Sequence, residues 1–270
     1  MANTYVIDMI VLNKGKINPA KRTVYLDIDD VILWSAGTIV EMLNDRYGLN
    51  KTRDDIKDWG FKSIKRDLDV QEVLDMFCED EFWQRNKPNQ ELIDAFELDE
   101  NNQDGLFQSY NWRLVTKRDE VNLKKKFDKI FSIPFFARHK DEIGYYGLEH
   151  DEDKASVRML GRIQIDDYYF NLKDTDASVK ILLKNNLDAN YNSHYTYKDG
   201  LQNLYVCDNL NQVIDILREK DLASRLPIEK CYHDNQGNDH CILLQRCQCF
   251  ILFHDYSPFP DFKMQDMIVS

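Results

Sequence analysis

The sequence predicts an α/β fold: a Rossmann-like parallel sheet, a helical insertion after the first core strand, and a β-rich C-terminal extension. Short apolar segments typical of buried strands alternate with segments of helical periodicity. Residues 50–104 are charged and helical in pattern, with few strand signals. Polar side chains follow the predicted strands at their carboxyl ends, which is where parallel sheets place their sites.

We expect three regions. Residues 1–33 and 108–222 form the α/β core, residues 34–107 form the helical insertion, and residues 223–270 form the extension.

The N-terminal elements follow from local patterns. Thr4 to Leu12 is apolar and β-rich, and the turn at Asn13 to Lys16 makes it an added hairpin strand. Thr23 to Asp27 is a nearly continuous apolar run, as in strands buried on both faces. Ile39 to Tyr47 has the apolar spacing of a helix.

The remaining elements alternate between strands and helices. Trp112 to Thr116 is a short strand, Glu120 to Phe131 is a basic helix, and Ile133 to Ala137 is a further strand. The apolar run Ile163 to Ile165 leads into an acidic pair. The last elements are two strands, Lys180 to Leu183 and Leu204 to Cys207, and a helix, Leu210 to Glu219.

Composition excludes some classes of protein. The chain has 270 residues with 35 basic and 47 acidic side chains, and its net charge of −12 disfavours a general nucleic-acid-binding protein. No apolar run is long enough for a membrane span. Because we see no secretory signal in the first residues, we expect a cytoplasmic protein whose six cysteines are reduced.

The segment Val24 to Val31 carries the strongest signal. Its apolar run ends in Asp27, Asp29 and Asp30. Residues two apart on a strand share one face, so Asp27 and Asp29 repel each other unless a cation or a proton relieves the clash. This arrangement indicates a site; the alternative is a polar turn after an edge strand.

Three further elements follow in order along the chain. Thr116 closes a second core strand, Lys154 precedes a third, and Asp166 and Asp167 close that third strand. This ordered set resembles the four motifs of the haloacid-dehalogenase-like (HAD) phosphohydrolase superfamily, over residues 22–218. The insertion then matches the position of the small helical cap in that superfamily.

The resemblance implies a role for each residue. Asp27 would be the nucleophile that forms an aspartyl-phosphate, and Asp29 the general acid and base. Thr116 would bind a phosphoryl oxygen, and Lys154 would offset charge on Asp27 and the phosphoryl group.

The resemblance also implies a magnesium ion, which suits oxygen ligands. Asp27, the Asp29 carbonyl, and Asp166 or Asp167 would hold it. Asn171 resembles the asparagine that often follows the acidic pair. The pair alone is also compatible with an ordinary turn.

Other interpretations stay open. Thr116 also fits a strand-end cap. Lys117, Lys124, Lys125 and Lys126 compete with Lys154, but we interpret the last three as a solvated helix face. Asp30 stands where many members of the superfamily have glycine, which means either altered activity or a family variant.

The pattern Ile-Asp-Asp-x-x-x-Asn-Leu and the length of the insertion resemble the cytosolic 5′(3′)-deoxyribonucleotidase branch. This implies a nucleoside monophosphate as the small phosphorylated substrate. A nucleobase needs a stacking surface, for which the candidates are Trp34, Trp59, Phe61 and Trp83, with Lys117 as a further substrate-binding candidate. The alternative for the aromatic residues is packing within the insertion.

Two alternative functions remain. A polynucleotide end-phosphatase needs a basic groove, to which Lys117 to Lys129 would contribute. A non-catalytic protein on the same scaffold would bind a nucleotide or another protein.

The extension carries six potential zinc ligands: Cys231, His233, His240, Cys241, Cys247 and Cys249. Their spacing is not that of a standard zinc site, so we favour a β-hairpin with Gly237 in its turn. Cys241 to Leu244 and Cys249 to Phe253 are its expected strands, and the hairpin would cover a sheet edge or form a homodimer contact.

Overall fold

We describe the fold from a computed structural model. It describes residues 10–58, 60–98, 100–102, 105–118, 120–148, 153–184, 203–225, 228–233 and 239–244. The chain divides into two compact units, Met1–Asp221 and Leu222–Ser270. Across the described residues, every helix is too short or too polar to cross a bilayer.

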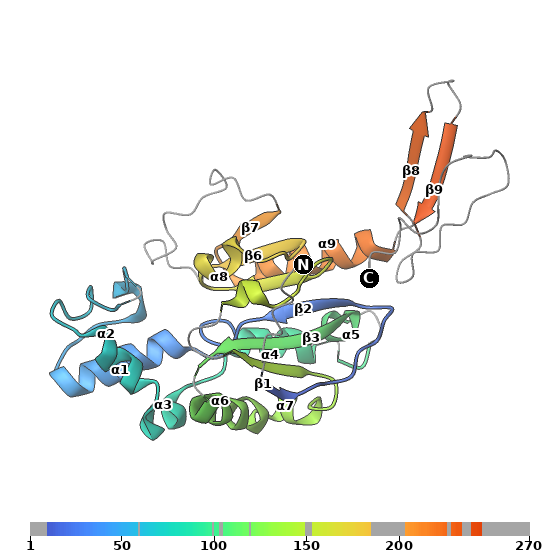
Figure 1. The fold of residues 1–270 in the computed structure, drawn as a ribbon. Coiled ribbons are helices and arrows are strands. Elements are labelled where there is room, and N and C mark those ends of the chain that lie inside the picture. Colours follow the sequence, from blue (N-terminus) through green and yellow to red (C-terminus); the bar gives the residue numbers. More distant parts are fainter. Residues whose placement is uncertain are drawn as a thin grey trace, which may run out of the picture. The chain divides into compact units, whose positions relative to one another are not determined.

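A seven-stranded sheet organises the first unit (Figure 1). Its spatial order is β1-β4-β3-β2-β5-β6-β7, and every neighbouring pair is parallel except β1 and β4. The predicted Rossmann-like α/β class is therefore confirmed. The strands are β1 (Ile10–Asn13), β2 (Arg22–Leu26), β3 (Tyr110–Lys117), β4 (Gly144–Leu148), β5 (Ile163–Asp166), β6 (Val179–Leu183) and β7 (Leu204–Cys207).

The N-terminal strand has a different partner from the one expected. Residues 4–9 of the predicted hairpin strand lie outside the described residues, and β1 pairs with β4 rather than with β2. Asn13 Nδ2 donates to the Ile143 carbonyl at 2.7 Å, and Lys16 N donates to the Asp141 carbonyl at 2.8 Å. These contacts hold the segment beside β4, so it extends the edge of the sheet.

The main core forms between the sheet and the helices that follow its strands. Buried residues of β2, β3 and β5, such as Leu26, Leu114 and Ile165, share one cluster with Phe96, Ile130 and Leu217 from the helices. The helices of this part are α4 (Gln90–Glu97), α5 (Leu106–Ser109), α6 (Glu120–Ser132), α7 (Pro134–Arg138), α8 (Tyr169–Lys173) and α9 (Leu210–Arg225).

The strand predicted at Ile133 to Ala137 is wrong, because this segment forms α7. Pro134 stands at the first helical position, where its fixed φ suits a helix and its missing N–H costs no hydrogen bond. Phe135 and Phe136 are buried in the main core, which explains why the segment is apolar enough to resemble a strand.

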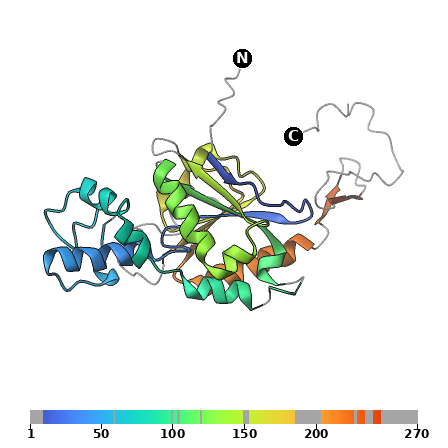
Figure 2. The ribbon, with the colours of Figure 1, turned by 90° about the horizontal axis from the view of Figure 1, so that it is seen from below.

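The insertion comprises α1 (Ser35–Tyr47), a short 3₁₀ helix η1 (Arg53–Asp55), α2 (Val70–Met76) and α3 (Asp80–Arg85). It has a hydrophobic cluster of its own, which includes Ile39, Leu43 and Phe82. Figures 1 and 2 show these helices as a lobe beside the sheet. Helix α4 and the first two residues of α5 also lie in the range 34–107 expected for the insertion, but both helices pack in the main core.

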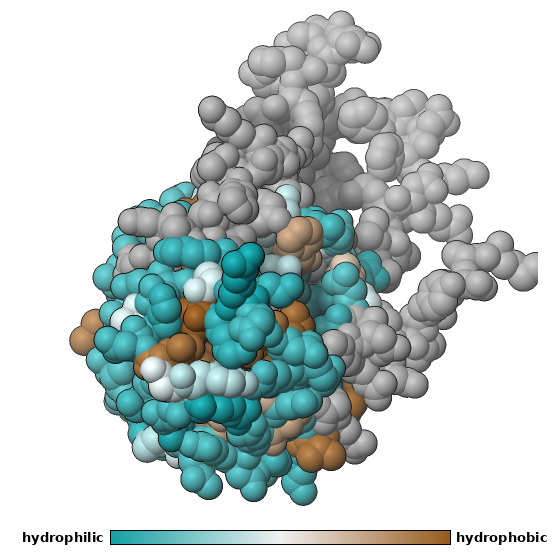
Figure 3. All heavy atoms as spheres, turned by 90° about the vertical axis from the view of Figure 1, so that its left-hand side faces the viewer, coloured by the Kyte–Doolittle hydropathy of each residue, from teal (hydrophilic) through white to brown (hydrophobic). Residues whose placement is uncertain are grey.

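The apolar side chains of the insertion turn inward. Figure 3 views the molecule from the side of this lobe and shows a largely hydrophilic face with a small apolar area near its centre and a few apolar residues at its margin. This distribution is what a small helical layer with its own core should show.

The two ends of the insertion are fastened to each other. Trp34 N donates to the Lys87 carbonyl at 2.9 Å, and Asn89 N donates to the Ile32 carbonyl at 2.7 Å. The Asn89 side chain adds a bond from Nδ2 to the Val31 carbonyl at 3.0 Å. The chain therefore leaves and re-enters the core at one place.

The second unit contains an antiparallel pair, β8 (Ile228–His233) and β9 (Asp239–Leu244), with Cys231 opposite Cys241. The predicted strand at Cys241 to Leu244 is confirmed, but it pairs with β8. Gly237, Cys247 and the segment 249–253 lie outside the described residues. The zinc site and the homodimer contact stay predictions.

Candidate active site

Three central strands bring predicted site residues to one edge of the sheet. Strand β2 lies between β3 and β5 and runs parallel to both, with Leu26 aligned with Leu114 and with Ile165. Asp27 directly follows β2, Thr116 is the penultimate residue of β3, and Asp166 ends β5. The three side chains are buried, and each stands at the carboxyl end of its strand.

The loop after β2 is wound tightly by backbone hydrogen bonds. Asp27 N donates to the Ile165 carbonyl at 3.0 Å, and Asp30 N donates to the Leu33 carbonyl at 2.7 Å. Ile32 N and Leu33 N both donate to the Ile28 carbonyl at 2.9 Å. This winding fixes the positions of Asp27 and Asp29 on the core.

Asp27, Asp166 and Asp167 form a buried acidic cluster. Each offers a carboxylate oxygen, and these atoms lie within 4.8 Å of one another. Lys154, in the short 3₁₀ helix η2 (Lys154–Ser156), places Nζ 2.7 Å from Asp27 Oδ1 and 2.7 Å from Asp166 Oδ2. Three carboxylate oxygens at this separation are donors that fit a hard divalent cation such as magnesium.

Burial controls the protonation of this cluster. Asp166 is fully buried, and desolvation raises its pKa to about 6 although the Lys154 ammonium opposes the shift. For Lys154, burial lowers the pKa, but Asp166 and Asp27 outweigh it and raise the pKa above its ordinary value. Tyr168 N and Asn171 Nδ2 each donate to Asp166 Oδ1 at 3.0 Å and fix its orientation.

Asp29 faces a second set of groups. It accepts from Ser35 Oγ at 2.6 Å, from Arg118 Nη2 at 3.1 Å, and from Lys126 Nζ. Burial raises the pKa of Asp29, but Lys126 and Arg118 outweigh it and hold the pKa below its ordinary value. Asp29 is therefore ionised at neutral pH in this state.

Lys126 is the main residue that the sequence analysis misplaced. The prediction of a solvated face is wrong for Lys126, whose side chain is 0% exposed. It lies on α6 in phase with the apolar residues Leu123 and Ile130, because positions three and four apart share a helix face. That phase was the signal in the sequence. Burial lowers the pKa of Lys126 to about 8, while Asp29 opposes the shift.

Lys126 also orients Thr116. Its Nζ donates to Thr116 Oγ1 at 2.8 Å, so the threonine hydroxyl accepts on that side and its own hydrogen can be donated to another acceptor. Lys124 is exposed as predicted, and Lys125 pairs with Asp80 at 2.7 Å.

The aromatic candidates fall in different places. Phe61 and Trp83 are buried in the cluster of the insertion, and Trp59 lies outside the described residues. Trp34 follows the loop after β2 and lines a pocket. Lys117 is the last residue of β3 and is half-buried.

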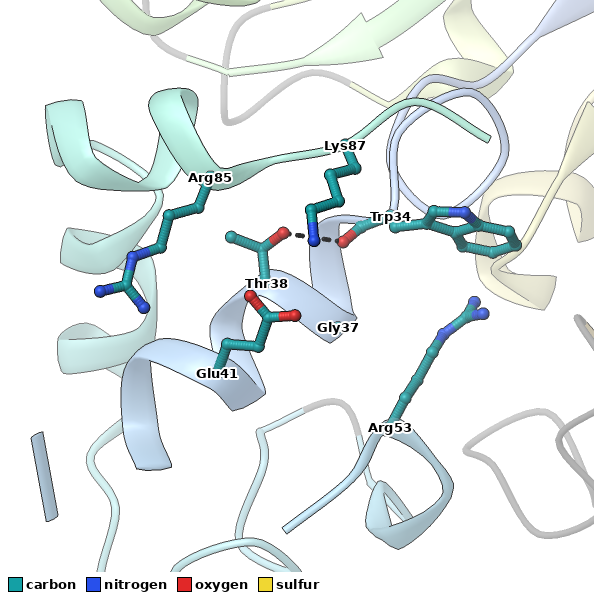
Figure 4. A pocket seen from close by; sticks show the side chains of 7 residues that line it. All are labelled: Trp34, Gly37, Thr38, Glu41, Arg53, Arg85 and Lys87. Atoms are coloured by element: carbon teal, nitrogen blue, oxygen red, sulfur yellow. Dashed lines mark hydrogen bonds between the residues drawn. The ribbon is translucent and has the colours of Figure 1, made fainter. Parts of the chain in front are cut away.

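The pocket beside Trp34 has a volume of about 300 Å³ (Figure 4). Three cationic side chains and one carboxylate contribute to its wall. Its lining residues are Trp34, Gly37, Thr38, Glu41, Arg53, Arg85 and Lys87. Of these residues only Trp34 was predicted from the sequence, because nothing in the local pattern singles out the arginines.

Comparisons with known proteins add little. No protein-family model and no curated protein sequence matches the chain. A solved structure of a HAD-superfamily hydrolase, subfamily IA, variant 1, from Geobacter sulfurreducens is 11% identical and covers 77% of this chain and all of that one, with a TM-score of 0.41. Because both values are low, the chemistry of the site is interpreted from its own residues.

Proposed function

We propose that the chain is a HAD-like, magnesium-dependent phosphomonoester hydrolase. The observation that supports this proposal is the buried convergence of Asp27, Asp166, Asp167 and Lys154 at the carboxyl edge of the sheet. Buried carboxylates at such short separation need a cation to stay ionised together. A structural turn gains nothing from burying several carboxylates together, whereas a phosphoryl-transfer site uses them to bind a metal ion and to attack phosphorus.

Asp27, Asp166, Asp167 and the Asp29 carbonyl are the proposed magnesium ligands. When bound, the ion offsets the charge of the acidic cluster and of a phosphoryl group.

Asp27 is the proposed nucleophile. Its carboxylate attacks phosphorus, the bond from phosphorus to the leaving oxygen breaks, and an aspartyl-phosphate forms. Lys154 Nζ, 2.7 Å from Asp27 Oδ1, orients the carboxylate for attack. Lys126 donates to the Thr116 hydroxyl oxygen, so Thr116 can donate its hydroxyl hydrogen to a phosphoryl oxygen.

Asp29 is the proposed general acid and base. It gives a proton to the leaving oxygen, then takes one from the water that hydrolyses the aspartyl-phosphate. Arg118 and Lys126 hold Asp29 ionised in the present state. Phosphoryl oxygens compete for these two cations, and as they turn away from Asp29 its pKa rises toward the range where it carries a proton.

Nucleoside monophosphates are the proposed substrates. The pocket beside Trp34 has about the volume that small-ligand sites require at their lower end, and it combines an aromatic ring with cationic side chains. A polynucleotide substrate is less well supported. Lys126 is buried and Lys125 is paired, so the basic stretch from Lys117 to Lys129 offers less free charge than its composition suggests.

A phosphate-release assay tests the proposal. The purified chain is given p-nitrophenyl phosphate and a panel of nucleoside monophosphates, with magnesium or with EDTA. We expect magnesium-dependent turnover and a covalent phosphoenzyme that can be trapped by quenching with acid. Asp27→Asn should lower kcat by more than about 10³-fold.

Asp75→Asn is a matched control, because Asp75 is an exposed aspartate on α2 whose side chain accepts from Gln71 Nε2 at 2.8 Å. Full activity in Asp27→Asn contradicts the nucleophile assignment. No turnover in the wild type, together with nucleotide binding, supports the non-catalytic alternative.

A further inference from the structure

Asp30 connects the loop that carries Asp27 and Asp29 to the insertion. Its backbone has a φ of 52°, in the region that favours glycine, and its side chain is buried. The carboxylate accepts from Ala36 N at the start of α1, at 3.2 and 3.1 Å. It also accepts from Arg53 Nη2, on η1, at 3.3 Å.

Arg53 forms part of the pocket wall. Its guanidinium carbon lies 4.1 Å from the centre of the Trp34 ring, and Figure 4 shows the side chain reaching from η1 toward that ring. The Nε of Arg53 is buried and has no hydrogen-bond partner among the described residues. A buried N–H without an acceptor is costly and therefore calls for an explanation.

We infer that Arg53, held by Asp30, is a specificity-determining residue whose guanidinium donates to a planar, ring-bearing leaving group with an oxygen or nitrogen acceptor. Asp30 accepts from Nη2, and the contact with Trp34 orients the guanidinium plane, so a ligand in the pocket meets a guanidinium of fixed orientation. The inference rests on the proposed function for the meaning of "leaving group".

The presence of an aspartate at position 30 supports this assignment. Glycine adopts a φ near 52° without strain, whereas aspartate does so at some cost. The carboxylate offsets that cost by capping α1 and by holding Arg53. The segment that bears the proposed nucleophile is thus tied, through one ion pair, to the residue that contacts the leaving group.

Gly37 offers a second probe of the same pocket. A Cβ built at this position meets only Arg53 Cδ, at 3.9 Å, which is an ordinary van der Waals contact. Gly37→Ala therefore adds a methyl group to the pocket wall without a clash, and alanine favours the helical backbone more than glycine does.

The experiment compares two substrates with similar aliphatic leaving oxygens: thymidine 5′-monophosphate, which carries a ring, and glycerol 2-phosphate, which does not. The variants are Arg53→Lys, Asp30→Asn and Gly37→Ala. The control is Asp67→Asn, because Asp67 is 84% exposed, pairs with Lys65 and is absent from the pocket wall.

Arg53→Lys keeps the charge and removes the planar fork. We expect it to lower the ratio of kcat/KM for the nucleotide over glycerol phosphate by about 10-fold, mainly through KM. Asp30→Asn should change the ratio in the same direction. Gly37→Ala should also lower it while the melting temperature stays the same or rises, which excludes a folding defect. If these residues had only a general structural role, the variants would lower kcat/KM equally for both substrates.

Calorimetric binding of thymidine 5′-monophosphate and of inorganic phosphate separates the two proposals. Turnover with a ratio that Arg53→Lys and Gly37→Ala leave unchanged overturns this inference and leaves the proposed function intact. No turnover, but nucleotide binding that weakens about 10-fold in Arg53→Lys while phosphate binding does not, refutes the proposed function and supports recognition by Arg53.

Discussion

Replacing Lys154 with methionine removes the cation between two buried carboxylates. Lys154 Nζ lies 2.7 Å from both Asp27 Oδ1 and Asp166 Oδ2, and all three side chains are at most 7% exposed. Methionine fills a similar volume, so the change tests charge rather than packing. Without the ammonium, Asp27 and Asp166 lose the ion-pair partner that they share.

The magnitude follows from this burial. Removing one partner of a buried ion pair costs about 3–5 kcal/mol. We expect the lower half of that range at pH 7.5, because Asp166 can take up a proton instead of remaining charged. For a domain of this size, about 3 kcal/mol corresponds to a fall of about 6–12 °C in Tm.

The cost should shrink as the pH falls. Burial already raises the pKa of Asp166 to about 6, against the opposing Lys154, and loss of Lys154 raises it further. A carboxyl group with a raised folded pKa binds more protons in the folded state, so lowering the pH stabilises that state. Between pH 7.5 and pH 6 the variant should recover up to about 2 kcal/mol relative to the wild type, at about 1.36 kcal/mol per pH unit.

Urea unfolding in EDTA at both pH values measures the effect, with Lys51→Met as the control. Lys51 pairs with Asp55 at 3.7 Å on the surface, where such pairs contribute about 0–1 kcal/mol. A loss below about 1 kcal/mol at pH 7.5, or a loss that grows as the pH falls, would refute the view that Lys154 neutralises this cluster.

Three further predictions concern the metal, the general acid and a thiol. Magnesium at 10 mM should raise Tm by about 3–5 °C if its Kd is about 1 mM, and Asp166→Asn should abolish that rise in differential scanning fluorimetry. Asp29→Asn should slow hydrolysis of glycerol 2-phosphate by about 10²–10⁴-fold and that of p-nitrophenyl phosphate much less, because p-nitrophenolate leaves without a proton; equal slowing in the kinetic assay contradicts the role. Burial raises the pKa of Cys207 to about 12, whereas Cys78 is exposed. Peptide mapping after alkylation at pH 8 should therefore show Cys78 modified well before Cys207. The rate of Cys207 labelling should rise about tenfold per pH unit.

The acidic edge of the sheet was predictable because its signals are local. An apolar run that ends in aspartate marks the carboxyl end of a strand, and two such runs, ending at Asp27 and Asp166, lie side by side once the strand order is known. The convergence of these residues with Asp167 and Lys154 therefore follows from pattern and topology.

The second set of groups was harder to predict because it depends on tertiary contacts. Lys126 belongs to a run of three lysines, and only its phase relative to Leu123 and Ile130 distinguishes it from exposed neighbours. Arg53 and Asp30 are 23 positions apart and meet only after the insertion folds back on the core. A similar limit applies to α7. Its apolar residues Phe135 and Phe136 give the segment the pattern of a buried strand, and only Pro134 indicates the start of a helix.

The joined ends of the insertion have a mechanical consequence. Trp34 N donates to the Lys87 carbonyl, so the two chain segments that connect the lobe to the core run side by side rather than separately. The Lys125–Asp80 ion pair between α6 and α3 holds the lobe at a second place. Because the two ends of the lobe meet, a connector of very few residues would bridge the gap if the lobe were removed.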